Sequence, residues 1–193
     1  MKNHSPRLLL ALLVLSLGSL GATDSCGSDI LADPSFDLWC QDEAGQQTLC
    51  TWELEEGRIE PVPTWHEAEE GASLIGELVS ISQLVELGSD ELDCIFFTLN
   101  AEVSDEDDAD SGERASLALL LDFNDDGLVE LDQVLVADDY RAVQLFLTPP
   151  EEFESVRVRV RKTGAGEAIL AAIRAQSESS DNCHEAPIEL LQP

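Results

Sequence analysis

Apolar and polar residues alternate with a period of two through much of the chain after residue 80. In the clearest case three valines alternate with three arginines over residues 156–161, which places the valines on one face of a strand and the arginines on the other. Similar patterns predict strands at 81–87, 95–103, 115–123, 128–136, 142–148 and 168–175. Gly, Pro or Asp clusters separate most of them at short intervals, so we predict an all-β, antiparallel β-sandwich.

The N-terminal residues have the layout of a secretory signal peptide. Lys2 and Arg7 precede an almost wholly apolar run, residues 8–20, which is followed by Gly21 and Ala22. The run is too short to favour a membrane span. We therefore expect a signal peptide at 1–22, a polar lead-in at 23–35, one sandwich domain at 36–176 and a C-terminal tail at 177–193. The expected location is secreted, periplasmic or on the cell surface.

The five cysteines fit export, because disulfides form in oxidising compartments. Cys40 and Cys50 are close in sequence, and we predict that they close a bridged loop. Cys183 could tie the tail to Cys94 or Cys26, which leaves one cysteine over. Cys26 also raises the alternative of a lipid anchor, but the residues before it include an aspartate that suits a lipoprotein signal poorly. We therefore favour simple secretion.

The net charge of −30, from 40 acidic and 10 basic residues, narrows the range of partners. Nucleic acid phosphates and anionic membrane surfaces would both be repelled. Arg157, Arg159 and Arg161 form the one basic stripe. Its simplest role is to pair with carboxylates on adjacent strands, and a site for an acidic sugar is the alternative.

One turn carries the pattern of a calcium loop. Residues 122–127 read DxNxDG, with oxygen side chains at alternate positions before a glycine that allows a sharp turn. Gln133 stands where an EF-hand has its bidentate Glu, and the flanks read as strands, which argues against an EF-hand. Calcium binding and a plain acidic hairpin turn both remain open. The candidate metal ligands are Asp122, Asn124, Asp126, Glu130 and Asp132.

Aromatic residues are scarce and divide into two groups. Trp39 and Trp52 flank the paired cysteines and are expected in the core. Trp65 and Tyr140 lie near acidic residues outside the strand patterns, and we predict them as ligand-binding residues that could stack on sugar rings. Catalysis finds little support, because the chain after residue 22 has two histidines and neither accompanies a GxSxG nucleophile motif. We predict that the protein is not an enzyme.

Several short motifs resemble a known family. The chain has Asp33-Pro34-Ser35-Phe36, then Trp65, Ala72-Ser73-Leu74 and Ile81-Ser82-Gln83, with Pro149-Pro150 and Gly166–Leu170 further on. This order is similar to the galactose-binding-like jelly roll, and more narrowly resembles carbohydrate-binding modules of the CenC type. The family's last strand usually carries an Asp that helps to hold a structural calcium, whereas the aligned residues here are Ala171 and Ala172.

The resemblance implies a jelly-roll sandwich that binds a glycan without catalysis. We therefore expect a secreted binding module for a carbohydrate at the cell surface or outside the cell. The alternative is a calcium-assisted structural or adhesion protein that binds another protein. A hydrolase is a third and weaker hypothesis.

Overall fold

The structure is a computed structural model that describes residues 29–42, 44–64, 70–87, 94–104, 115–136, 141–150, 152–178 and 189–191. The predicted signal segment, the lipidation candidate Cys26, and the predicted ligand residues Trp65 and Tyr140 lie outside these ranges. Within the described residues, no helix has the length and apolar character needed to cross a membrane.

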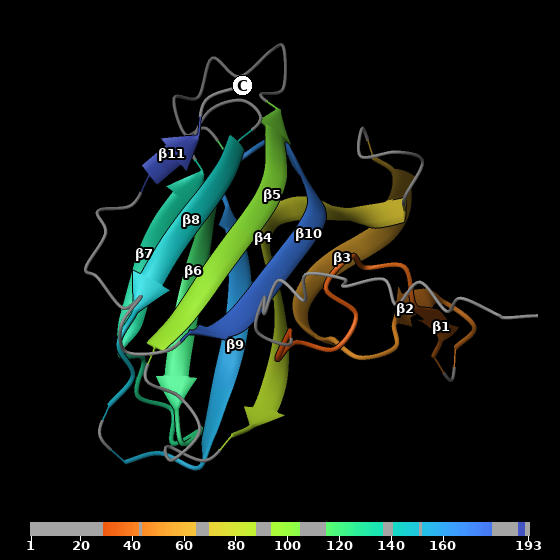
Figure 1. Ribbon diagram of the computed structural model, residues 1–193. Helices are drawn as coiled ribbons and strands as arrows, with labels where there is room; N and C mark the ends of the chain where they lie inside the picture. The colour runs from red at the N-terminus through yellow and green to blue at the C-terminus, as the bar shows by residue number, and fades with distance from the viewer. Residues whose placement is uncertain are drawn as a thin grey trace, which may run out of the picture.

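The described elements are all strands (Figure 1). In chain order they are β1 (Trp39–Gln41), β2 (Gln47–Leu49), β3 (Glu53–Pro63), β4 (Glu70–Glu86), β5 (Cys94–Ser104), β6 (Ser116–Phe123), β7 (Leu131–Val136), β8 (Arg141–Leu147), β9 (Ser155–Thr163), β10 (Glu167–Glu178) and β11 (Glu189–Leu191). Strands β1 and β2 form a small separate hairpin, and the others join in one antiparallel hydrogen-bonded sheet of order β11-β8-β5-β10-β4-β9-β6-β7, with β3 beside β4.

The long strand β4 folds this sheet into two layers. Residues 72–74 pair with β10, whereas residues 78–86 pair with β9. Figure 1 shows β8, β5 and β10 in one layer and β6 and β9 in the other. The predicted all-β, antiparallel sandwich is therefore correct.

Glycines allow β3 and β4 to turn from one layer into the other. Gly57 and Gly76 have φ angles of 84° and 123°, values that L side chains rarely adopt. A Cβ atom on Gly57 would lie 2.7 Å from the carbonyl oxygen of Leu78 and 2.7 Å from a methyl carbon of Val79. The β3–β4 register shifts on both sides of Glu56, so the two strands bend together at a pair of β-bulges.

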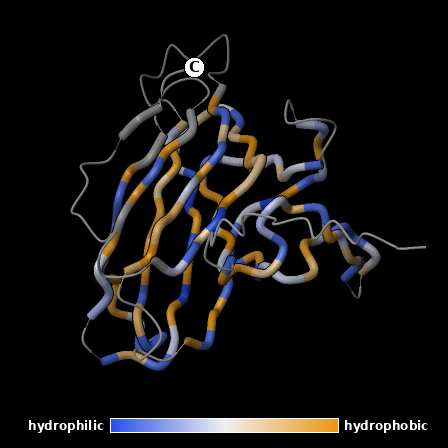
Figure 2. Tube along the Cα trace, in the orientation of Figure 1, coloured by the Kyte–Doolittle hydropathy of each residue, from blue (hydrophilic) through white to orange (hydrophobic). Residues whose placement is uncertain are grey.

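The core lies between the layers and follows the alternation in the sequence. The valines of β9 are fully buried, and the three arginines between them point to the outer face. Leucines 117, 119 and 121 of β6 face the same interior. Figure 2 shows hydrophobic and hydrophilic residues alternating along the strands of both layers.

The structure contains two stretches of strand before residue 81 that the sequence pattern did not predict. Strand β3 and the first half of β4 were not anticipated, because β3 is a mostly exposed edge strand with charged residues, a glycine and two prolines. Proline is tolerated there because an edge strand leaves some amide positions unpaired. In contrast, β7 begins at Leu131, three residues later than predicted, and Leu128 and Val129 are exposed.

Residues 29–35, in the expected lead-in, pack on the edge of β10. The amide of Ile30 donates to Ala175 O at 2.7 Å, and the amide of Ile173 donates to Pro34 O at 2.8 Å. Leu31 is buried in the core. In the expected tail, β11 pairs with β8.

Cys40 and Cys50 form the predicted disulfide, which closes the β1–β2 hairpin. Trp52 is buried against Phe36 and Trp39 is partly buried against the core, as predicted for both tryptophans. Cys94 is also disulfide-bonded.

The bend predicts a large effect for Gly57→Ala. The new methyl group would meet backbone and Val79 while the residue keeps a positive φ, so we expect a loss of about 3 kcal/mol in urea unfolding. Gly45→Ala is the matched control, because Gly45 also has a positive φ of 79° but no atom within 4 Å of the new Cβ. The control should lose only about 1 kcal/mol. Equal losses in both variants would show that the close approach at the bend is not what requires glycine.

Candidate functional site

The outer face of the β3-β4-β9-β6-β7 layer carries a ladder of ion pairs. Arg159 and Glu55 form a two-bond pair, with Nε to Oε2 at 2.6 Å and Nη2 to Oε1 at 2.8 Å. Arg157 makes a similar pair with Asp125, at 2.6 and 3.0 Å. Arg161 makes a single 3.0 Å bond from Nη2 to Asp132.

The arginines pair with carboxylates as predicted, but Glu55 and Asp132 do not lie on the strands adjacent to β9. Glu55 is on β3 and Asp132 is on β7, and each of these strands is two positions away from β9. The residues opposite the two arginines on the intervening strands are small: Ser82 lies beside Arg159 on β4, and Ala118 lies beside Arg161 on β6. The long arginine side chains therefore span a strand to reach their partners.

Glu55 is held in its ionised form. Burial alone would raise the pKa of its carboxyl, but hydrogen bonds from Arg159, Ser80 and Ser82, and the charge of Arg159, lower that pKa from 4.5 to about 2. The Ser80 hydroxyl donates to Glu55 Oε2 at 2.7 Å. Arg159 and Glu55 thus satisfy each other through two hydrogen bonds and form a pair with no net charge.

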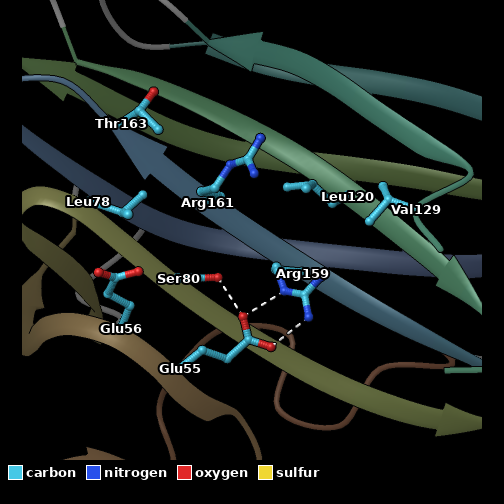
Figure 3. A pocket seen from close by; sticks show the side chains of 9 residues that line it. All are labelled: Glu55, Glu56, Leu78, Ser80, Leu120, Val129, Arg159, Arg161 and Thr163. Atoms are coloured by element: carbon cyan, nitrogen blue, oxygen red, sulfur yellow. Dashed lines mark hydrogen bonds and ion pairs between the residues drawn. The ribbon is translucent and has the colours of Figure 1, made fainter. Parts of the chain in front are cut away.

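A groove of about 400 Å³ lies over this pair (Figure 3). It is lined by Glu55, Glu56, Leu78, Ser80, Leu120, Val129, Arg159, Arg161 and Thr163. Leu78 and Val129 are about two-fifths exposed, at 39% and 41%, and give the groove apolar margins. The groove therefore combines hydrogen-bonding groups with apolar surface, as small-ligand sites do.

The β3 bulge brings two neighbouring glutamates to this groove. In a regular strand Glu55 and Glu56 would point to opposite faces. The register instead shifts between Leu54 and Glu56, and both glutamates line the groove. Bulges re-aim side chains in this way.

Arg161 is the less engaged of the two arginines in the groove. Its side chain is 36% exposed, and its partner Asp132 is 53% exposed, so their ion pair contributes little energy. Its Nε atom is buried and has no hydrogen-bond partner among the described residues, so a ligand would meet the outer part of the guanidinium. Arg159, in contrast, already has both of its bonds to Glu55.

The predicted calcium loop forms a tight turn. Asn124, Asp125 and Gly127 all have positive φ angles, and the Asp122 carboxylate accepts hydrogen bonds from the amides of Asp126 and Gly127, each at 3.1 Å. The Asp126 carboxylate accepts a 2.8 Å bond from the amide of Leu128. These carboxylates thus hold the turn's own backbone.

The other predicted metal ligands are also engaged in hydrogen bonds. Asn124 Oδ1 accepts from the amide of Glu154, Glu130 accepts from the amide of Phe123, and Asp132 pairs with Arg161. Among the described residues, no three His, Cys, Asp or Glu side chains gather into a group that could hold a metal. Calcium binding at this loop remains a prediction.

Sequence reasoning missed most of the groove. The alternation indicated the outward direction of Arg159 and Arg161, but Glu55, Glu56 and Leu78 reach the groove through the unpredicted bend. Val129 lies in the β6–β7 connection, where a strand was expected. The EEG sequence at residues 55–57 is the one local signal for a bulge, because a glycine inside a strand often marks one.

Comparisons with known proteins identify the fold. No family model matches the chain, and no curated protein matches it. Solved structures of carbohydrate-binding modules do match. A CBM4 structure has a TM-score of 0.53 and 12% identity over 77% of this chain and 99% of the module. TmCBM61, solved in complex with β-1,4-galactotriose, has a TM-score of 0.50 and 13% identity over 78% of this chain and 99% of the module.

Two further matches have the same architecture. The CBM22-1 xylan-binding domain of Paenibacillus barcinonensis Xyn10C has a TM-score of 0.50 and 12% identity, over 79% of this chain and 96% of that domain. The enzymatically active domain of tailspike protein 4 from bacteriophage CBA120 has a TM-score of 0.53 and 10% identity, but only 21% of that chain is covered. The protein therefore has the jelly-roll fold of carbohydrate-binding modules, in agreement with the resemblance found in the sequence.

The Arg159–Glu55 pair predicts a pH-dependent stability difference between the wild type and Glu55→Gln. The folded pKa of about 2 lies below the ordinary value of 4.5, so ionised Glu55 stabilises the fold above about pH 4.5, and this contribution is lost as the pH falls toward 2. After allowance for solvent screening we expect Glu55→Gln to cost about 1–2 kcal/mol at pH 7. The difference should disappear near pH 2 in denaturant titrations. A difference that stays constant over this pH range would refute the ionic origin of the contribution.

Proposed function

We propose that this protein is a secreted, non-catalytic module that binds a glycan in the outer groove lined by Arg161, Ser80 and Leu120. The observation that carries the proposal is this groove, on a jelly-roll fold shared with carbohydrate-binding modules. The disulfide between Cys40 and Cys50 supports an extracellular location, because disulfides persist in oxidising compartments.

The chemistry of the groove suits a sugar. Hydroxyl groups can accept hydrogen bonds from the Arg161 guanidinium and donate them to the exposed Glu56 carboxylate. The C–H faces of a sugar ring can rest against the aliphatic margins, Leu78 and Val129. Arg159 and Glu55 need no ligand to satisfy them, so they give the groove a fixed shape.

Trp65 and Tyr140 belong to the same proposal as stacking residues. Their rings would add the aromatic surface on which sugars commonly pack. Trp65→Ala and Tyr140→Ala should each weaken glycan binding, and unchanged binding would rule out a stacking role for the residue replaced.

The alternative is a structural or adhesion protein that binds another protein with the help of calcium. Exposed apolar residues near the predicted calcium turn favour it: Leu128, Val129 and Val134 are all exposed. On this hypothesis a glycan panel would give no binding, and added calcium would raise the melting temperature more than sodium at equal ionic strength.

The proposal predicts binding in a polysaccharide panel that starts with β-1,4-galactan and xylan. For the polysaccharide that binds, Arg161→Gln should reduce the affinity about tenfold in isothermal titration calorimetry, because a charged donor to the ligand is lost. Arg58→Gln is the control, since Arg58 also forms a single-bond ion pair with a carboxylate, Glu60, but lies outside the groove and is more exposed than Arg161. The control should bind like the wild type. If both variants reduced the affinity equally, the groove would not be the binding site.

A further inference from the structure

Lys162 is a charged residue in the core, directly behind the groove. It follows the last arginine of β9 and has the inward direction of the valines at 156, 158 and 160. Its side chain is fully buried. The flanking residues Arg161 and Thr163 line the groove on the opposite face of the same strand.

The ammonium group of Lys162 bonds to backbone carbonyls at two turning points of the chain. Nζ donates to the carbonyl of Gly76, at the bend of β4, and to the carbonyl of Gly164, in the β9–β10 connection, the latter at 2.7 Å. Both glycines have positive φ angles. A buried ammonium is costly unless its donors are satisfied, and these bonds satisfy two of them.

Gly76 stands where β4 changes partners. Pairing with β10 covers residues 72–74, and pairing with β9 begins at Leu78. The β3–β4 ladder also interrupts here, because it passes from Ile75 to Ser80. The Gly76 carbonyl is therefore bonded by Lys162 at a point between the two ladders.

The residues after the bend build one wall of the groove. Leu78 lines it, and Ser80 donates the 2.7 Å hydrogen bond that holds Glu55. Glu55 in turn holds Arg159 in the floor. A continuous set of contacts thus runs from the Lys162 ammonium through the β4 bend to Glu55.

We propose that Lys162 is a positioning residue for the groove: its ammonium fixes the bend of β4 at Gly76 and so places Ser80 and Glu55 against Arg159. The role of the groove in ligand binding rests on the proposed function, but the fixing of the bend does not. Lys162 itself touches no ligand, because it is enclosed in the core.

Lys162→Met tests this inference, because it keeps an unbranched side chain of similar length but removes the charge and the donors. The readout is the titration of the Glu55 carboxyl, followed by ¹³C NMR. We expect the pKa of Glu55 to rise by about one unit or more from its value near 2, since displacement of the bend weakens the hydrogen bond from Ser80. Lys162→Gln retains donor hydrogens, so in this variant the pKa of Glu55 should lie between its values in the wild type and in Lys162→Met.

Val143→Ala is the matched control for a general loss of packing. Val143 is a buried residue of β8, in the other layer. This variant should lose stability and leave the Glu55 titration unchanged. If Lys162→Met also leaves it unchanged, Lys162 only fills the core and the inference is wrong.

Two further measurements keep the test decisive. If Lys162→Met does not fold, the wild type serves instead: its Nζ protons should exchange with water slowly enough to be observed by ¹⁵N NMR, and rapid exchange would overturn the inference. Once a glycan ligand is known, Lys162→Met should also weaken its binding. A wild type that binds no glycan would refute the proposed function and leave the Glu55 result standing.

Discussion

The close approach of β3 to β4 at Gly57 is the constraint on which the rest of the structure depends. No side chain fits between the Gly57 α-carbon and the backbone of Leu78, so the two strands can bend together only at glycine. The bend carries β4 from the β10 layer into the β9 layer and so encloses the core. It also shifts the register of β3 and brings two consecutive glutamates to the outer face.

The ion pairs on that outer face differ in how exposed they are and in how many hydrogen bonds they contain. Arg159 and Arg161 extend over small neighbours to carboxylates two strands away, and the more enclosed of these two pairs is also the better satisfied. Arg159 and Glu55 are both about one-quarter exposed and share two bonds, whereas Arg161 and Asp132 share one bond and are more exposed. We therefore infer that the Arg159–Glu55 pair gives the groove its shape and that Arg161, in its weaker ion pair, is available to bind a ligand. This division supports the proposed glycan site on an otherwise very acidic protein.

The sequence predicted what depends on alternation and missed what depends on the bend. Val156, Val158 and Val160 define a core face by themselves, so β9 and its layer could be predicted. Strand β3 could not, because an edge strand with exposed charges and two prolines lacks that pattern. Lys162 shows the limit most clearly. The alternation along β9 directs this lysine inward, but the pattern does not show that its ammonium bonds to the carbonyls of Gly76, on β4, and Gly164, just after β9. The groove wall was missed for the same reason, since Glu55 and Leu78 meet through the bend.

The most direct test of the account is chemical-shift mapping of the ¹⁵N-labelled protein during titration with the glycan that binds in the panel. The account predicts shifts concentrated on β9, on β4 after the bend and on the β6–β7 connection, with Ser80, Arg161 and Val129 among the largest. The β5–β8 pair in the other layer should change little. Shifts confined to that other layer, or spread evenly over the protein, would contradict the assignment of the groove as the binding site.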